Sequence, residues 1–288
     1  MTKKRSTWVA LLLSLAEPGL GFIYNTKITA GFVIIVLSNL ISILLLALSD
    51  VFKSAWVLFA SFASIILFYI GTLIYVALDA RRLGVVPLTP YNRGYIYILI
   101  VVVTYSLNFL TPESSVKSYS MPTGSMEPSI LPGDFVMVDM EEPNRRNFQR
   151  GDLIVFKEPR DTTSHFLKRL VAFARDTVEI IDGRVFVNRQ EFMPYLPIKR
   201  TNWERLSADF VEDQIYPPGA GNSDHYGPIV VPQDSIFFLG DHRDNSLDSR
   251  YIGFAGRDAI LGIPLYIYWS RDLSRIGKNL VQRHNEPA

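Results

Sequence analysis

Long apolar runs fill much of the first 110 residues of the chain, and short β-rich runs broken by turn residues replace them afterwards. Three of the long runs, 29–48, 54–78 and 94–110, approach the roughly 20 residues that an α-helix needs to cross a bilayer. None of them keeps the polar face that a core helix of a soluble protein usually shows. We therefore expect a membrane domain over residues 1–110, with transmembrane helices at these three runs.

The segment 8–23 is also apolar, but its composition argues against a full span. It contains Glu17, Pro18, Gly19 and Gly21, so a span would place a carboxylate and a helix breaker in hydrocarbon. A cleaved secretory signal is the alternative, because basic residues precede the run, but no Ala-x-Ala-like sequence closes it. The pattern favours a re-entrant or interfacial segment.

After residue 110 the pattern changes to short strands separated by turn residues. Several short strands at irregular spacing favour an antiparallel sandwich or barrel over a parallel α/β sheet. We expect a β-rich domain over 111–288, with an elaborated loop or small subdomain at about 189–227. The expected fold class is thus N-terminal transmembrane α-helices followed by a mainly β domain. The strand candidates are 135–140, 153–157, 165–172, 177–181, 184–188, 235–239 and 263–269.

Charge is distributed unevenly between the two halves. Residues 1–110 carry eight Lys or Arg and three acidic residues, whereas 111–288 carry 21 basic and 25 acidic ones. The second half has no basic field, so we expect no nucleic-acid partner. The basic start of the chain and the loop with Arg81, Arg82 and Arg93 should be cytoplasmic by the positive-inside rule. Three spans then place residues 111–288 on the extracytoplasmic (periplasmic) side of the inner (plasma) membrane.

Several kinds of chemistry find no support in the sequence. The chain has no cysteine, which removes disulfides, thiolate catalysis and Cys-type zinc sites. No phosphate loop, dinucleotide fingerprint or metal-binding His pair is present, so we expect no cofactor and no metal. There is no Gly-x-Ser-x-Gly elbow; a Ser-His-Asp triad stays open, because triads are assembled in space.

Two positions stand out as candidate catalytic groups. Ser125 lies in the segment Met121–Pro128, where two prolines and a glycine give the rigid presentation that a nucleophile needs. Lys168 should share a strand face with Phe166 and Leu170, and burial there would favour its neutral form, a possible base. The alternatives are a purely structural turn and an edge-strand lysine in water.

A third segment, 240–250, is rich in carboxylates interleaved with arginines. The Asp spacing does not match a calcium loop. Internal ion pairs and turn hydrogen bonds are therefore the favoured use of Asp244, Asp248 and the arginines, ahead of metal binding.

Taken in this order after an apolar helix, the three segments resemble bacterial signal peptidase I. The resemblance covers most of 111–288, and its most specific parts are 122–128, the Lys168-Arg169 pair and 240–254. It implies a serine endopeptidase with a Ser-Lys dyad that removes N-terminal signal peptides from exported preproteins.

The resemblance also implies roles for individual residues. Ser125 matches the nucleophile and Lys168 the general base. The Ser125 backbone N–H and the Thr123 hydroxyl match the oxyanion hole, a kind of donor that often contributes about 3 to 4 kcal/mol. Three residues match supporting positions: Ser246, which orients the lysine amine, and the ion pair of Asp248 and Arg250.

Substrate recognition follows from the same resemblance. The family binds the end of the signal peptide as an extended strand and accepts small residues at the first and third positions before the cut, the Ala-x-Ala pattern. Small pockets reject large side chains by overlap. The implied partners are signal peptides of secreted preproteins, the lipid bilayer and the secretion translocon. The positions that match the pocket walls are Met121, Pro122, Met126, Ile130, Phe166 and Leu167.

The chain departs from the family pattern in several places. Residues 172–176 replace a Gly-Leu-Pro-Gly-Asp turn, Arg189 stands where glycine is common, and His242 stands where asparagine is usual. The turns must therefore be built differently. The leader is longer than usual, and residues 18–25 resemble a motif of small two-helix membrane modules, which suggests a fused extra domain.

Other functions compete with this interpretation. A self-cleaving Ser-Lys protein like the SOS repressors is disfavoured by the membrane spans and the acidic second half. A catalytically inactive protein that binds signal peptides is disfavoured by the presence of Ser125, Lys168, Ser246 and Thr123. A specialised paralogue with a narrow substrate range remains an alternative.

Overall fold

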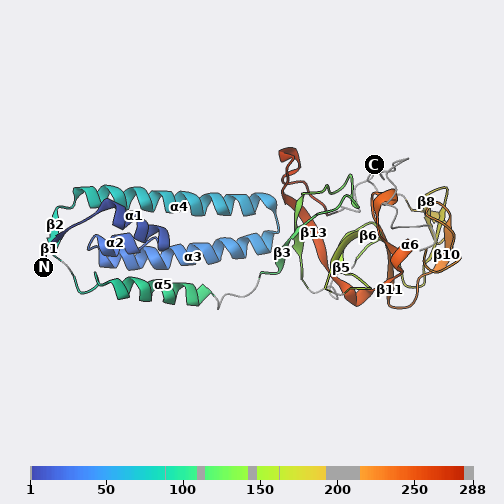
Figure 1. Cartoon of the computed structure of the whole chain (residues 1–288), viewed down its shortest axis with the longest axis horizontal. Coiled ribbons are helices and arrows are strands. Elements are labelled where there is room, and N and C mark those ends of the chain that lie inside the picture. The colour runs from blue at the N-terminus through green and yellow to red at the C-terminus, as the bar shows by residue number, and fades with distance from the viewer. Residues whose placement is uncertain are drawn as a thin grey trace. The chain divides into compact units, whose positions relative to one another are not determined.

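The described part of the chain comprises residues 2–87, 89–108, 114–141, 148–161, 163–192 and 215–281 of a computed structural model. It falls into two units, a helical one over Met1–Ser114 and one built from strands over Ser115–Ala288 (Figure 1). The predicted order, apolar helices followed by antiparallel β structure, is confirmed.

Within the described residues of the helical unit, two helices are long and apolar enough to cross a membrane, α3 and α4. Most of their apolar side chains are exposed, which suits a lipid surrounding. α5 is apolar but has 15 residues, and the end of its predicted run lies outside the described residues. The strands β1 (Thr2–Lys4) and β2 (Val85–Pro87) pair antiparallel and form a short two-stranded sheet. The helices are α1 (Thr7–Ala16), α2 (Leu20–Tyr24), α3 (Ile28–Phe52), α4 (Ala55–Arg82) and α5 (Gly94–Asn108).

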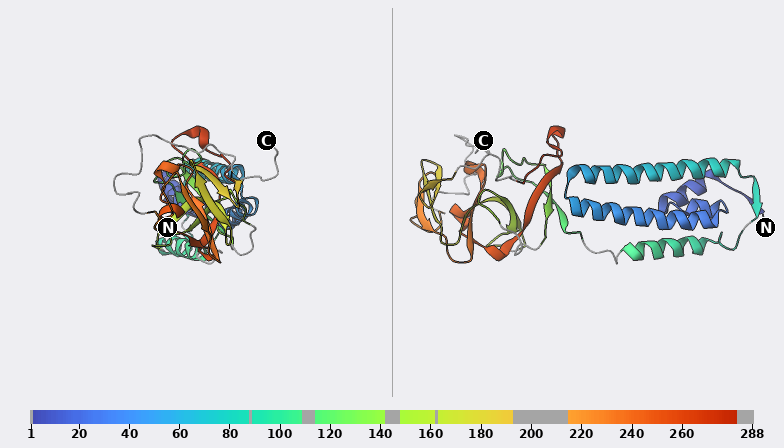
Figure 2. Two further views of the ribbon diagram at one scale, coloured as in Figure 1. Left: turned by 90° about the vertical axis from the view of Figure 1, so that its right-hand side faces the viewer. Right: turned by 180° about the vertical axis from the view of Figure 1, so that it is seen from behind.

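The apolar segment at 8–23 forms the two short helices α1 and α2, which lie along α3 and α4 (Figure 2). Glu17, between them, is 5% exposed, and its Oε1 accepts hydrogen bonds from Ser38 and Asn39 at 3.4 Å. A Cβ on Gly19 would lie 2.1 Å from the carbonyl oxygen of Gly31. Only glycine therefore permits this close approach of α2 to α3.

The second unit is organised entirely by antiparallel pairing among its described strands. One seven-stranded curled sheet has the order β12-β11-β6-β5-β13-β4-β3, and a four-stranded sheet has the order β10-β7-β8-β9. The strands are β3 (Val116–Ser120), β4 (Phe135–Asp139), β5 (Leu153–Lys157), β6 (His165–Phe173), β7 (Thr177–Ile181), β8 (Arg184–Val187), β9 (Gln190–Glu191), β10 (Tyr226–Val230), β11 (Ser235–Leu239), β12 (Ala255–Gly256) and β13 (Ile260–Trp269).

All seven predicted strands are present, and β5, β7 and β11 have the predicted bounds. Among the described strands of this unit, four were not predicted: β3, β9, β10 and β12. In the helical unit, β1 and β2 were not predicted either. The expected loop or subdomain at 189–227 lies largely outside the described residues, since 193–214 are not described.

The turn after β6, for which the resemblance implies glycines, is closed by hydrogen bonds of Arg175 and Asp176. Arg175 takes the left-handed conformation with φ 71°, and its N–H donates to the Val231 carbonyl at 2.9 Å. Asp176 accepts from the Phe173 N–H and from the Asn188 side chain, both at 2.7 Å. An Asp that bonds the backbone three residues earlier can stabilise a turn that lacks glycine.

The buried strand β5 separates two apolar clusters in the second unit. Ile154 and Phe156 contribute to one cluster, and Leu153 and Val155 to the other, because successive side chains of a strand point to opposite faces. β6 pairs with β5 so that Lys168 lies opposite Ile154. Lys168 therefore lies on an inner strand of the seven-stranded sheet, between β11 and β5.

Candidate active site

Ser125 lies in a turn that follows β3 and is closed by backbone hydrogen bonds. The Met121 N–H donates to Asp134 at 2.9 Å, and the Glu127 N–H donates to Gly124 at 3.1 Å. The Ser125 carbonyl accepts from the backbone N–H of His242 at 3.1 Å. Because this contact uses only backbone, the exchange of asparagine for histidine at 242 preserves it. Ser125 is 6% exposed.

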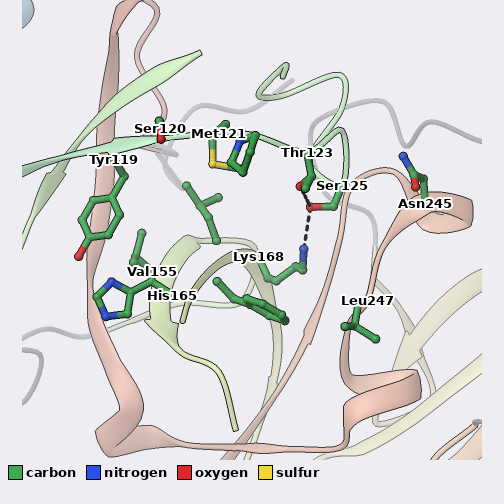
Figure 3. Close-up of a pocket in the computed structure, with 13 residues that line it drawn as sticks. Tyr119, Ser120, Met121, Thr123, Ser125, Val155, His165, Lys168, Asn245 and Leu247 are labelled. Atoms are coloured by element: carbon green, nitrogen blue, oxygen red, sulfur yellow. Dashed lines mark hydrogen bonds between the residues drawn. The ribbon is translucent and has the colours of Figure 1, made fainter. Parts of the chain in front are cut away.

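Lys168 points from β6 to the hydroxyl of Ser125 (Figure 3). Its Nζ donates to Ser125 Oγ at 2.7 Å, across 43 positions of sequence. The Phe166 ring centroid lies 5.3 Å from the same nitrogen. Lys168 is 5% exposed, so the burial predicted from its strand position is confirmed.

The surroundings of Lys168 favour its neutral form. Burial is the main cause, and it lowers the pKa of the lysine from 10.5 to about 8. The negative charges of Asp248 and Asp241 oppose this shift, and the Arg250 guanidinium adds to it. An amine with such a pKa is neutral in part of the population near pH 8, and it can then accept a proton.

Arg169, the next residue of β6, points to the other side of the strand and anchors it there. It is 1% exposed, and its Nε donates to Asp241 at 2.6 Å. Its Nη1 donates to the Gly151 carbonyl at 2.6 Å. Ser129, four residues after Ser125, donates to Asp241 as well. These bonds tie the strand of Lys168 to the turn of Ser125.

The segment 240–250 is held by a buried ion pair. Arg250 donates through Nε and Nη2 to the two oxygens of Asp248 at 2.9 and 3.0 Å. Burial pushes the pKa of Asp248 up, but the charge and hydrogen bonds of Arg250 outweigh it and the net direction is down. Arg250 also donates to the Arg243 carbonyl at 2.6 Å. The favoured use of this segment, internal ion pairing, is confirmed for Asp248 and Arg250.

Ser246 is buried in the same segment, but it does not bond Lys168. Its Oγ has no hydrogen-bond partner within the described residues. The oxygen lies against Gly240, where a Cβ would be 2.1 Å away. The lysine–Ser246 hydrogen bond that the resemblance implies is therefore not made in this structure.

Two groups that can donate hydrogen bonds lie close to the Ser125 hydroxyl. The Thr123 hydroxyl lies 3.4 Å from Ser125 Oγ. The Ser125 backbone N–H has no acceptor among the described residues, which leaves it available. A backbone N–H and a nearby hydroxyl are the kind of groups that stabilise a developing oxyanion.

A pocket of about 350 Å³ opens beside the Ser125–Lys168 pair. Of the predicted wall residues, Met121, Pro122, Phe166 and Leu167 line it. Met126 and Ile130 do not: both are 0% exposed and belong to the apolar core beneath the turn. The walls that sequence reasoning missed are Tyr119, Ser120, Val155, His165, Asn245 and Leu247.

Comparisons with known proteins agree on one family. A family model described as signal peptidase, peptidase S26, matches residues 94–269. A signal peptidase I of Aquifex aeolicus is 30% identical, over 61% of this chain and 82% of that protein. Signal peptidase I P of Bacillus subtilis subsp. natto is 28% identical, over 59% and 85%. A crystal structure of a signal peptidase I from Enterococcus faecalis is 29% identical, covers 41% of this chain and 97% of that chain, and has a TM-score of 0.31.

Proposed function

The chain belongs to the signal peptidase family, peptidase S26, and we propose that it removes signal peptides from preproteins by a Ser125–Lys168 dyad. Membership makes it a serine endopeptidase. The observation that carries the proposal is the 2.7 Å contact between Lys168 Nζ and Ser125 Oγ at the edge of the pocket.

The first half of the reaction acylates the serine. Neutral Lys168 takes the proton of Ser125 Oγ as the oxygen attacks the carbonyl carbon of the scissile bond. The Ser125 N–H and the Thr123 hydroxyl stabilise the oxyanion that forms. The Lys168 ammonium then gives its proton to the leaving amine, and the mature protein departs.

The second half releases the signal peptide. Lys168, neutral again, takes a proton from a water molecule, whose oxygen attacks the acyl carbon. Collapse of this second intermediate breaks the bond to Ser125 Oγ, and Lys168 returns the proton to the serine. The dyad ends in its starting state, so no cofactor is needed.

The pocket beside the dyad supports the Ala-x-Ala preference. We expect the purified chain in detergent to cut a precursor after Ala-x-Ala, and a Leu at the position before the cut to lower kcat/KM by roughly a hundredfold or more, because overpacking a shaped pocket costs about 1–3 kcal/mol and misplaces the carbonyl. Mass spectrometry of the products gives both the site and the rate. The matched control is a Leu at the second position before the cut, whose side chain points away in an extended peptide. Equal rates for all three precursors would contradict the assignment of the pocket.

The pKa of Lys168 predicts the pH profile. Only the neutral amine accepts a proton, so kcat/KM should rise about tenfold per pH unit up to about 8 and then level off. The profile is measured between pH 5 and 9 with a substrate that has no titrating group, and circular dichroism at each pH shows whether the fold persists. A flat profile over this range would rule out a buried lysine as the base.

We further propose a multi-pass topology. α3 and α4 would cross the inner membrane, and the run that begins with α5 would return the chain to the periplasmic side. The clusters of basic residues at the start of the chain and around Arg81, Arg82 and Arg93 support a cytoplasmic location for those segments. The catalytic unit would then meet its substrates as they leave the secretion translocon.

A further inference from the structure

Asn245 occupies a position beside the dyad to which neither the mechanism nor the comparisons give a role. It ends a short 3-10 turn, Arg243–Asn245, within the 240–250 segment. It lines the same pocket as Ser125 and Lys168. A Cβ built on Gly124 would lie 3.5 Å from Asn245 Nδ2, so the amide faces the turn between the two oxyanion donors.

Hydrogen bonds hold the backbone of Asn245 in place, whereas its side-chain amide forms no hydrogen bond with the described residues. The Asn245 N–H donates to the His242 carbonyl at 3.0 Å. Arg243 donates to the Gly240 carbonyl at 3.1 Å, and Arg250 in turn bonds the Arg243 carbonyl. Among the described residues, no hydrogen bond is made by the Asn245 side-chain amide. The side chain is half-buried at the edge of the pocket, so its donors and its acceptor are accessible to a bound ligand.

The pocket has two ends, and the dyad lies between them. Figure 3 shows Tyr119 and His165 to one side of Ser125 and Lys168, and Asn245 and Leu247 to the other. An extended peptide advances by about 3.3 Å per residue. If the residues before the cut lie toward Tyr119 and His165, the chain must leave the dyad on the side of Asn245.

We propose that the Asn245 side-chain amide binds the backbone of the first residues after the cut, and so orients the leaving amine. A primary amide offers one acceptor and two donors, which match the N–H and C=O of a peptide group regardless of its side chain. Such a contact suits an enzyme whose products begin with different residues. This inference rests on the proposed function, because it needs a peptide that runs past Ser125.

The test compares two substrates that differ only after the cut. One is a peptide with Ala-x-Ala followed by several residues of a mature protein; the other has the same sequence up to the cut and ends there in an arylamide. For Asn245→Ala, kcat/KM for the long peptide should fall roughly three- to tenfold, which corresponds to the loss of one hydrogen bond. The arylamide, which has no backbone on that side, should be cut at the wild-type rate.

Two controls separate this role from a structural one. Asn279→Ala, an exposed asparagine outside the pocket, should leave both substrates unaffected. The pH midpoint near 8 should stay in place in Asn245→Ala, because this substitution adds no charge near Lys168.

Equal losses on both substrates, or no loss on either, would overturn the assignment. A shifted pH midpoint would overturn it too, since it would show that Asn245 acts by holding the loop. If the wild-type chain cuts neither substrate, the proposed function itself is wrong, and this inference falls with it.

Discussion

Ser125→Ala is expected to abolish cleavage of an Ala-x-Ala precursor while the fold stays intact. The substitution removes the atom that forms the acyl bond, and removal of a nucleophile costs about four orders of magnitude in rate or more. The substitution removes one oxygen atom from a turn that is held by backbone hydrogen bonds, so we expect the structure to stay unchanged. Single-turnover assays with product detection by mass spectrometry measure the residual rate.

The control for this prediction is Ser118→Ala. Ser118 lies on β3, is exposed and lies outside the pocket, so this variant should cut at the wild-type rate. A thermal unfolding midpoint within a few degrees of the wild type shows that the Ser125 variant is folded. Cleavage by Ser125→Ala at a rate close to the wild type would remove Ser125 as the nucleophile.

Lys168→Met is expected to abolish cleavage as well, and at the same time to stabilise the fold. Methionine keeps the volume and apolar stem of lysine but provides no base. Burial lowers the pKa of Lys168 from 10.5 to about 8, so the charged lysine destabilises the fold by about 3 kcal/mol below pH 8. The cost fades as the pH rises from about 8 toward 10.5, where the unfolded chain also loses the proton. The unfolding midpoint at pH 7 should therefore rise in the variant.

The matched control is Lys157→Met, which replaces an exposed lysine at the end of the neighbouring strand β5. It should change neither the rate nor the pH dependence of stability. The assignment of the base fails if Lys168→Met cuts at a rate comparable to the wild type. A lower unfolding midpoint at pH 7 would instead show that the ammonium is stabilised by its surroundings.

The local pattern of the sequence was enough to predict most of the fold. Short β-rich runs between turn residues marked β5, β7 and β11 with their observed bounds. The same reasoning missed β3, whose sequence Val116–Ser120 is mostly polar and partly exposed. β3 forms because its backbone pairs with β4 at the sheet edge, from Val116 opposite Asp139 to Ser120 opposite Phe135. A strand that pairs at a sheet edge through its backbone needs no run of apolar residues, so the hydrophobic pattern of the sequence does not indicate it.

The start of β13 was missed for a related reason. The strand begins at Ile260, three residues before the predicted start, and passes through Gly262. A Cβ on that glycine would lie 2.2 Å from the Asp139 carbonyl oxygen, so the close backbone contact requires glycine. Glycine has a low strand propensity, so a strand that contains it is hard to predict from the sequence, although here the glycine allows the two backbones to approach closely.

The candidate site was predicted in outline, but not in its details. The three motifs named Ser125, Lys168 and the Asp248–Arg250 pair, and the structure brings them together. Met126 and Ile130 were assigned to the pocket by resemblance, yet both lie in the core. The role of Asn245 had no signal in the sequence, because an asparagine in a turn-rich loop looks like any other turn residue.

The sequence by itself determined the apolar helices, most strands and the order of the three motifs, because periodicity and turn chemistry depend on residues close together in the chain. Only the tertiary structure decided that Lys168 forms a hydrogen bond with Ser125, 43 positions away in the sequence, and that its amine is buried there. The proton affinity of that amine depends on the neighbours that exclude solvent, and these come from β6, the turn after β3 and the 240–250 loop. No local pattern specifies such an assembly.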